Sequence, residues 1–104
     1  MKGALRSLLV TDIVGSTRLW AEHESAMAVD LVSHDEMVSA AIVSAGGRVF
    51  KHTGDGAMAT FEAATASAEA AAEIQRAIGG HVWGVPDGIR VRVALHSGSV
   101  HERA

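Results

Sequence analysis

The chain has 104 residues, 48% of them hydrophobic, with 9 Lys plus Arg against 12 Asp plus Glu and no cysteine. A chain of this length hides roughly 65% of its unfolded surface, enough for one two-layer core, so we expect a single domain over residues 1–104. The formal charge of −3 offers no broad field for nucleic acid or an anionic membrane. The lack of cysteine excludes disulfides, thiolate catalysis and Cys-ligated zinc, and fits a cytoplasmic protein.

The N-terminal apolar run is not typical of a targeting sequence. Arg6 and Asp12 interrupt it too early for a signal peptide. About 18 consecutive apolar residues occur nowhere, so we expect no membrane insertion. Residues 4–10 are predicted as a first strand that runs into a polar, glycine-containing turn at residues 11–17.

Residues 17–45 carry apolar side chains at mostly three-, four- and seven-residue intervals, and they end at the pair Gly46-Gly47. This pattern predicts helical structure. An unbroken helix would be about 43 Å long, which is long for so small a domain. We therefore expect a break near Glu24-Ser25, with Ser25 capping the second piece.

The second half of the chain predicts a hairpin, a helix and a last strand. Residues 48–53 and 57–61 are strand-like and are separated by Gly54-Asp55-Gly56, where Asp-Gly favours the positive φ angles of a tight hairpin. Residues 63–78 are alanine-rich and helical in pattern, with a stop at Gly79-Gly80. Residues 89–95 alternate between apolar and mostly polar side chains, as in a strand with one buried face.

The predicted order is therefore β-α-β-β-α-β. This order is typical of a ferredoxin-like α+β sandwich, in which an antiparallel sheet has its helices on one face. The other face of the sheet is left uncovered.

Two carboxylates are predicted to meet at one edge of this sheet. The first two strands are joined by a helical crossover and should run in the same direction, with Asp12 closing the first and Asp55 at the hairpin after the second. Paired hard oxygen anions repel each other and suit Mg²⁺ or Mn²⁺. The turn at residues 13–17 offers backbone N–H groups that attract phosphate, so the edge suggests a nucleotide site. In the plainer alternative, Asp12 and Ser16 cap the helix and Asp55 shapes the turn.

Three sequence blocks resemble the class III adenylate/guanylate cyclase catalytic domain, in the order and spacing of that family. They are LVTDIVGST at residues 9–17, GRVFKHTGDG at 47–56 and RVALHSG at 92–98. The resemblance covers residues 4–100. It implies a phosphorus–oxygen lyase of cyclic nucleotide biosynthesis in signal transduction. Such an enzyme is a homodimer with active sites between the subunits, and it forms 3′,5′-cyclic AMP and pyrophosphate from ATP, or acts on GTP, with two Mg²⁺ or Mn²⁺ ions.

The resemblance also implies roles for individual residues. Asp12 and Asp55 match the catalytic, metal-binding aspartates, and Ile13 would lend its backbone carbonyl to a metal. The turn residues expected to face the phosphates are Gly15, Ser16 and Thr17. Lys51 matches the lysine that reads adenine in the site of the partner subunit. The alternative for Lys51 is a solvated lysine on a strand.

The family domain continues past the fourth strand into a segment with a Val-Asn-x-Ala-Ala-Arg-type helix. By resemblance, its asparagine and arginine orient the ribose and stabilise the transition state. The sequence stops at Ala104 before such a segment, so we expect a truncated domain that is weak or inactive alone. Arg90 and Arg92 are interpreted as solvent-facing strand residues rather than replacements.

Two other functions stay open. One is a catalytically dead, cyclase-like module for nucleotide or metal binding or for dimerisation in signalling. The other is a diguanylate cyclase, which ranks last because residues 53–56 read Thr-Gly-Asp-Gly and not the Gly-Gly-Asp/Glu-Glu-Phe signature of that family.

Overall fold

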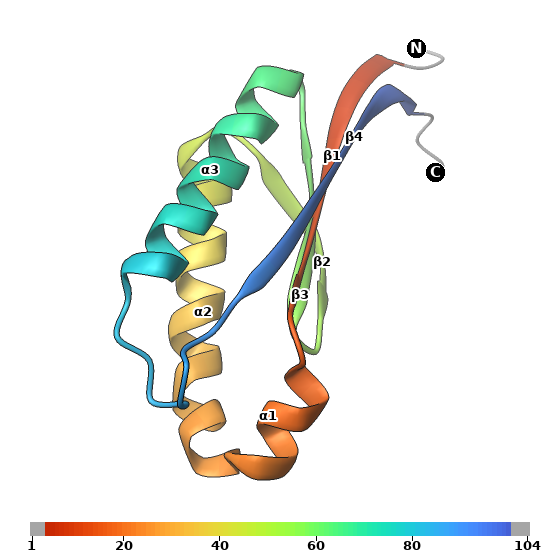
Figure 1. The fold of residues 1–104 in the computed structure, drawn as a ribbon. Helices are drawn as coiled ribbons and strands as arrows, with labels where there is room; N and C mark the ends of the chain where they lie inside the picture. Colours follow the sequence, from red (N-terminus) through yellow and green to blue (C-terminus); the bar gives the residue numbers. More distant parts are fainter. Residues whose placement is uncertain (1–3, 101–104) are drawn as a thin grey trace.

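The structure, a computed structural model, describes residues 4–100. Within that range four strands and three helices follow the predicted β-α-β-β-α-β order, with the first helical stretch divided in two (Figure 1). The elements are β1 (Ala4–Ile13), α1 (Ser16–Glu22), α2 (Glu24–Ser44), β2 (Arg48–Thr53), β3 (Gly56–Phe61), α3 (Ala64–Gly80) and β4 (Val91–Val100). The predicted α+β class is confirmed.

The four strands form one antiparallel sheet in the order β2-β3-β1-β4. β3 and β4 pair antiparallel with β1, and β2 pairs antiparallel with β3. β1 and β2 consequently run in the same direction with β3 between them, as the crossover predicted. The ferredoxin-like arrangement is thus the one observed.

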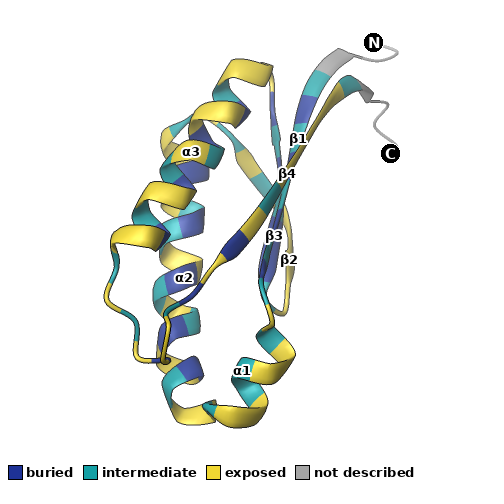
Figure 2. Ribbon diagram, viewed as in Figure 1, coloured by how far each residue is buried: buried dark blue, intermediate teal, exposed yellow. Residues whose placement is uncertain are grey.

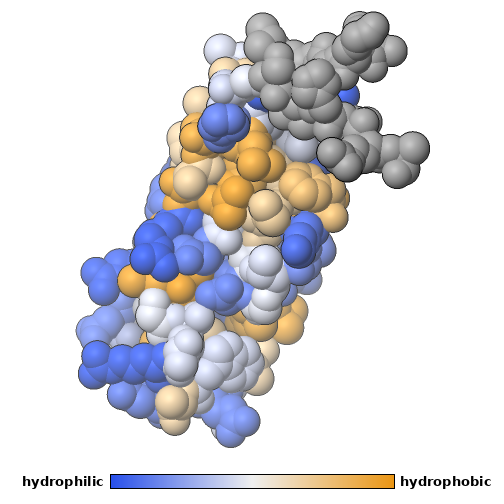
Figure 3. All heavy atoms as spheres, turned by 90° about the vertical axis from the view of Figure 1, so that its right-hand side faces the viewer, coloured by the Kyte–Doolittle hydropathy of each residue, from blue (hydrophilic) through white to orange (hydrophobic). Residues whose placement is uncertain are grey.

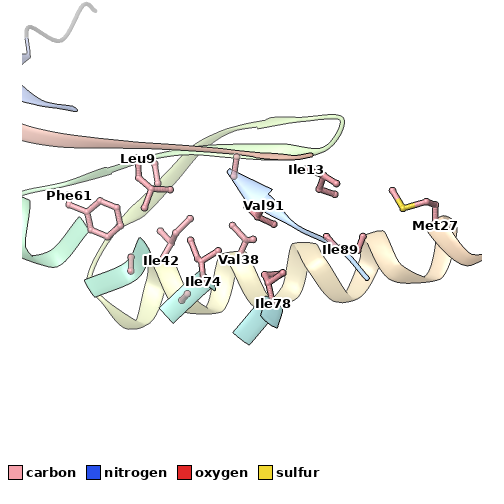
Figure 4. Close-up of a cluster of buried hydrophobic side chains, with 14 of the residues drawn as sticks. Leu9, Ile13, Met27, Val38, Ile42, Phe61, Ile74, Ile78, Ile89 and Val91 are labelled. Carbon is pink, nitrogen blue, oxygen red and sulfur yellow. The ribbon is translucent and has the colours of Figure 1, made fainter. Parts of the chain in front are cut away.

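The helices α2 and α3 pack against one face of the sheet, and their inner faces bury the core (Figures 1 and 2). β1 has two distinct faces, because Leu9 is fully buried whereas its neighbours Leu8 and Val10 are only partly buried. Figure 4 shows the larger core side chains between sheet and helices. They are Leu9, Ile13, Met27, Val38, Ile42, Phe61, Ile74, Ile78, Ile89 and Val91.

A buried carboxylate ties the segment between α3 and β4 to α2. Asp30 on α2 is 4% exposed and accepts hydrogen bonds from the backbone N–H groups of Gly84 (3.0 Å) and Val85 (2.9 Å). These bonds satisfy a carboxylate that would be costly to bury unpaired. The side-chain amide of Gln75 on α3 donates to the carbonyl of Val91 at 2.8 Å. The helical layer therefore holds the beginning of β4 in place.

The helix boundaries differ from the sequence prediction at two places. The predicted break is present, but it lies at His23, which precedes α2 without a side-chain capping bond. The expected Ser25 cap is therefore wrong, and Glu24 in the first turn instead places a negative charge at the positive end of the helix dipole. The pair Gly79-Gly80 forms the last turn of α3 rather than following it. Among residues 4–100, no helix is both long and apolar enough to cross a bilayer.

The predicted β2–β3 hairpin forms, but without the predicted turn geometry. Thr53 pairs with Gly56, which leaves the two-residue loop Gly54-Asp55. Neither loop residue has a positive φ, so that expectation is wrong. A register shift between Val49 and Lys51 marks an irregularity in β2. Such bulges locally increase the twist of a strand.

The sheet face away from the helices carries a band of apolar side chains. The registers place Met58, Val10 and Ala94 in one row across β3, β1 and β4. Figure 3 views the molecule from this side and shows apolar side chains gathered over part of the face, with hydrophilic ones beside and below them. The helices leave this face open, as the sequence predicted.

Candidate functional site

β1, the β2–β3 hairpin and α1 meet at one end of the sheet (Figure 1). Asp12 pairs in register with Gly56, so Asp55 at the hairpin tip adjoins the cross-strand partner of Asp12. The strands approach closely, because a Cβ on Gly56 would lie 1.9 Å from the backbone oxygen of Thr11. The Thr11 hydroxyl also accepts a 3.1 Å hydrogen bond from the backbone N–H of Ala57. The fold thus brings the two predicted carboxylates to the same end of the sheet, which we call the carboxylate edge.

The beginning of α1 is tied to the hairpin tip. Ser16, the first residue of α1, donates its hydroxyl hydrogen to Oδ2 of Asp55 at 2.7 Å. Gly15 precedes the helix at a φ of 67°, a left-handed conformation that glycine adopts readily, and no side chain caps α1. The alternative in which Asp12 and Ser16 cap this helix is therefore wrong. The Ser16 hydroxyl makes a tertiary contact instead, and the Asp12 carboxylate is engaged by another strand.

That engagement is a two-pronged ion pair between Asp12 and Arg92 on β4. Arg92 Nε donates to Oδ1 at 2.9 Å and its Nη2 donates to Oδ2 at 2.7 Å. The hydrogen bonds from Arg92 hold the pKa of Asp12 below its ordinary value, against a smaller opposing effect of burial. The same bonds raise the pKa of Arg92, and the charge of Asp55 adds a further attraction. The guanidinium is therefore attracted by both carboxylates, and it is hydrogen-bonded to Asp12.

Sequence reasoning missed this role of Arg92. The residue is solvent-exposed, as expected, with 70% of its side chain accessible, yet it is also the direct cross-strand partner of Asp12. The alternation in residues 89–95 predicted the face on which Arg92 lies. Only the β1–β4 register identifies the opposite charge across from it.

Lys51 lies on the open face of the sheet, displaced from the carboxylate edge. Its register partner on β3 is Met58, which pairs in turn with Val10 on β1, two residues before Asp12. Lys51 therefore lies on the face that carries Asp12, but β2 is about 10 Å from β1 because β3 intervenes. Lys51 is exposed, and no contact with the Asp12 carboxylate is present in the described part of the chain.

The remaining predicted site residues lie at the same end of the sheet. The side chain of Ile13 is in the core at 1% exposed, so only its backbone could face a ligand. Gly15 and Thr17 are exposed at the beginning of the seven-residue helix α1. The geometry is compatible with their predicted roles, which remain predictions.

The carboxylate oxygens at this end of the sheet suit a hard divalent cation. No cluster of three or more His, Cys, Asp or Glu side chains able to hold an ion occurs within residues 4–100. Asp12 and Asp55 supply two carboxylates, and Mg²⁺ in nucleotide sites is usually held by one or two carboxylates together with water and phosphate oxygens. The Arg92 guanidinium already lies against the Asp12 carboxylate, and the charge of Asp55 also attracts it, so this end of the sheet favours positive charge. The residues present therefore fit Mg²⁺ or Mn²⁺.

Comparison of sequences gives related proteins but no matching family model. A receptor-type adenylate cyclase of Trypanosoma congolense is 35% identical over 78 residues, which are 75% of this chain and 10% of that protein. An uncharacterized protein of Mycobacterium tuberculosis is 35% identical over 99 residues, which are 93% of this chain and 32% of that protein. The chain thus spans about a third or less of these relatives.

Solved structures match over nearly the whole chain. A Trypanosoma brucei adenylate cyclase in its monomeric state is 25% identical with a TM-score of 0.85, covering 90% of this chain and 55% of that one. An adenylate/guanylate cyclase/hydrolase of Silicibacter pomeroyi is 31% identical with a TM-score of 0.77, covering 94% and 59%. Two further domains share the fold at a TM-score of 0.82 and 17–18% identity, a Catenaria anguillulae guanylate cyclase domain in complex with GTP and a rhodopsin-guanylyl cyclase core in complex with ATPαS.

The strand order and these likenesses identify the fold of an adenylate/guanylate cyclase catalytic domain. The chain belongs to the class III adenylate/guanylate cyclase family, and it corresponds to somewhat more than half of the solved cyclase chains described above.

Proposed function

We propose that this chain binds ATP together with two Mg²⁺ or Mn²⁺ ions at Asp12 and Asp55, and that it takes part in forming 3′,5′-cyclic AMP and pyrophosphate. The reaction is an attack of the ribose 3′-hydroxyl on the α-phosphorus, with pyrophosphate as the leaving group. Two bound cations supply activation of that hydroxyl and neutralisation of the charge that grows on the leaving group. The chain's own part is to hold the ions and orient the phosphates.

The observation that carries this proposal is the convergence of Asp12 and Asp55 at one edge, with the hairpin tip fixed by Ser16. A carboxylate on a loosely held turn would make a poorly positioned ligand. Because the Ser16 hydroxyl donates to one oxygen of Asp55, the other oxygen keeps a constrained orientation and remains available to an ion.

The position of Lys51 supports a site shared between two copies of the chain. Lys51 lies two strands away from the strand that carries Asp12, so it is poorly placed to read a base held at its own aspartate edge. It does lie on the open, partly apolar face that a second copy would cover. We assign Lys51 to adenine recognition in the site of a partner copy in a homodimer, where its ammonium group donates to a ring nitrogen.

Calorimetry with a non-hydrolysable ATP analogue in the presence of Mn²⁺ tests the binding part. The expected result is binding that requires Mn²⁺ and is weakened in Asp12→Asn and in Asp55→Asn. A GTP analogue in the same experiment tests base preference. Lys51→Met should reduce any difference in affinity that favours the ATP analogue over the GTP analogue. Equal binding by Asp12→Asn/Asp55→Asn and the wild-type chain would overturn the site assignment.

A second candidate function is a cyclase-like module that binds nucleotide and metal or dimerises without turnover. One observation bears on it: these 104 residues include no asparagine, so this stretch by itself does not contain the asparagine that the family resemblance assigns to the ribose. The two candidates share the same binding site and differ in whether cyclic AMP forms. A product assay on the dimer therefore distinguishes them.

A further inference from the structure

The Asp12–Arg92 pair lies where the proposed metal site needs a free carboxylate. Both oxygens of Asp12 accept hydrogen bonds from one guanidinium, at 2.9 and 2.7 Å. A planar guanidinium matches a carboxylate in this two-pronged way, which makes it a specific partner rather than a diffuse counterion. In the absence of metal, the cation next to Asp12 is therefore supplied by the chain itself.

A divalent ion and this guanidinium cannot occupy the same carboxylate without repulsion. Two cations within a few ångströms repel each other strongly even near a protein surface. Arg92 pairs with Asp12 and is also weakly attracted by the charge of Asp55, so an ion that binds to Asp12 competes with it.

The surroundings of Arg92 allow such a displacement. Its side chain is 70% exposed, and its hydrogen bonds to Asp12 are side-chain contacts made across the end of two strands. A shallow hollow of about 520 Å³ adjoins the pair on the open sheet face, with walls that include Val10, Val93 and Ala94. The guanidinium can rotate away without any change in the β1–β4 register.

The geometry points to Arg92 as a built-in competitor of the metal: it holds Asp12 in a closed ion pair, and Mg²⁺ or Mn²⁺ binds by opening that pair. This inference rests on the proposed metal site. It adds that Arg92 leaves Asp12 when the metal ion binds. The pair cancels the charge of Asp12 before the ion arrives and leaves only the charge of Asp55 at this end of the sheet, which disfavours binding of stray cations.

Metal binding without nucleotide gives the first test. Mn²⁺ is titrated into the wild-type chain, Arg92→Gln and the matched control Arg90→Gln, which removes the same charge two residues away. Arg92→Gln should bind Mn²⁺ roughly two- to fivefold more tightly than Arg90→Gln, the factor expected for loss of an exposed ion pair. Arg92→Lys keeps the charge but loses the two-pronged hydrogen bonding. Its affinity for Mn²⁺ should lie between those of Arg92→Gln and the wild-type chain.

A second readout follows the arginine directly. The Nε–H resonance of Arg92, identified by its absence in Arg92→Gln, should move toward the position of free arginine as Mg²⁺ is added. In Asp12→Asn it should already be there before any metal is present. Both measurements report on the pair independently of enzyme activity.

The outcomes separate this inference from the function on which it rests. If Mn²⁺ binds in an Asp12-dependent manner but Arg92→Gln and Arg90→Gln bind equally, or if the Arg92 resonance stays fixed while Mg²⁺ binds, the competition is refuted and the metal site stands. If no Asp12-dependent binding occurs in any variant, Arg92→Gln included, the metal site and the inference both fail.

Discussion

Ser16 and Asp55 are joined by a 2.7 Å hydrogen bond across 39 positions of sequence. One residue begins α1 and the other forms the tip of the β2–β3 hairpin, so the bond connects two blocks that are remote in the chain. The same edge holds the Asp12–Arg92 pair, which links β1 to β4. The proposed site is therefore built from four separate segments, each positioned by a specific contact.

Replacing either aspartate should weaken metal-dependent nucleotide binding. Asp12→Asn and Asp55→Asn each remove a charged ligand, and we expect an affinity loss on the order of tenfold or more for ATP with Mn²⁺. The double variant should lose less than the sum of the two free-energy changes, because both residues hold the same ions. Calorimetry measures the affinities, and circular dichroism should show unchanged secondary structure in all three variants.

The open sheet face should mediate self-association. Met58 lies in one row with Val10 on that face. A glutamate at this position would be buried without a partner in a dimer. Met58→Glu should therefore weaken dimerisation by about tenfold or more. Val32→Glu on the exposed side of α2, where Val32 is 57% exposed, is the matched control and should leave association unchanged. Sedimentation velocity at high micromolar concentration reads out both. A wild-type chain that stays strictly monomeric there would contradict the prediction.

The 104 residues alone should form cyclic AMP very slowly or not at all, even with Mn²⁺. By family resemblance the groups that orient the ribose and stabilise the transition state are an asparagine and an arginine outside the three blocks found here. Loss of one preorganised transition-state donor typically lowers the rate about 10²- to 10³-fold. Without both donors, the rate should approach that of the uncatalysed reaction.

The assay for this prediction compares cyclic AMP produced by the 104-residue chain with that from a chimaera in which the C-terminal part of a class III cyclase domain follows Ala104. The chimaera should be faster by several orders of magnitude. Similar rates for the two would mean that residues within this chain complete the site.

The ion pair between Asp12 and Arg92 should make a small, pH-dependent contribution to stability. The pKa of Asp12 is lowered in the folded state, so the stabilisation is present above the unfolded-state value of about 4 and is lost as the pH falls through the folded-state pKa. It is small because the two side chains are 41% and 70% exposed. Thermal unfolding of Arg92→Gln should show a slightly lower Tm than the wild-type chain near neutral pH and the same Tm in strong acid. A difference that persists in acid would point to a cause other than this pair.

Gly56 should be much less tolerant of substitution than its neighbour Gly54. A Cβ on Gly56 would lie 1.9 Å from the Thr11 carbonyl oxygen, whereas a Cβ on Gly54 would meet nothing within 4 Å. Gly56→Ala must push β1 and β3 apart beside Asp12, at a cost of about 1–3 kcal/mol or more. Gly54→Ala should stay within about 0.5 kcal/mol of the wild-type chain. Denaturant unfolding of the two variants tests this, and equal stabilities would show that the strands can separate freely.

Much of the fold was predictable because hydrophobic period and glycine position report on local structure. The alternation of apolar side chains in the last strand and the three- and four-residue intervals in the helices follow from burial of one face. The failures were local: the cap expected at Ser25, the positive-φ turn at Asp55 and the stop at Gly79 all depended on propensities. Propensities are weak preferences that the tertiary context overrides: α2 begins without a side-chain cap, and α3 continues through Gly80.

The sequence by itself determined the element order, and with it the meeting of Asp12 and Asp55, because a crossover connection requires β1 and β2 to run in the same direction. The tertiary structure alone decided the partners of these carboxylates. Ser16 reaches Asp55, and Arg92 reaches Asp12, because the strand registers set which side chains face each other. Register depends on how the two sheet faces and the helical layer pack together, and a shift of one residue would turn Arg92 to the other face.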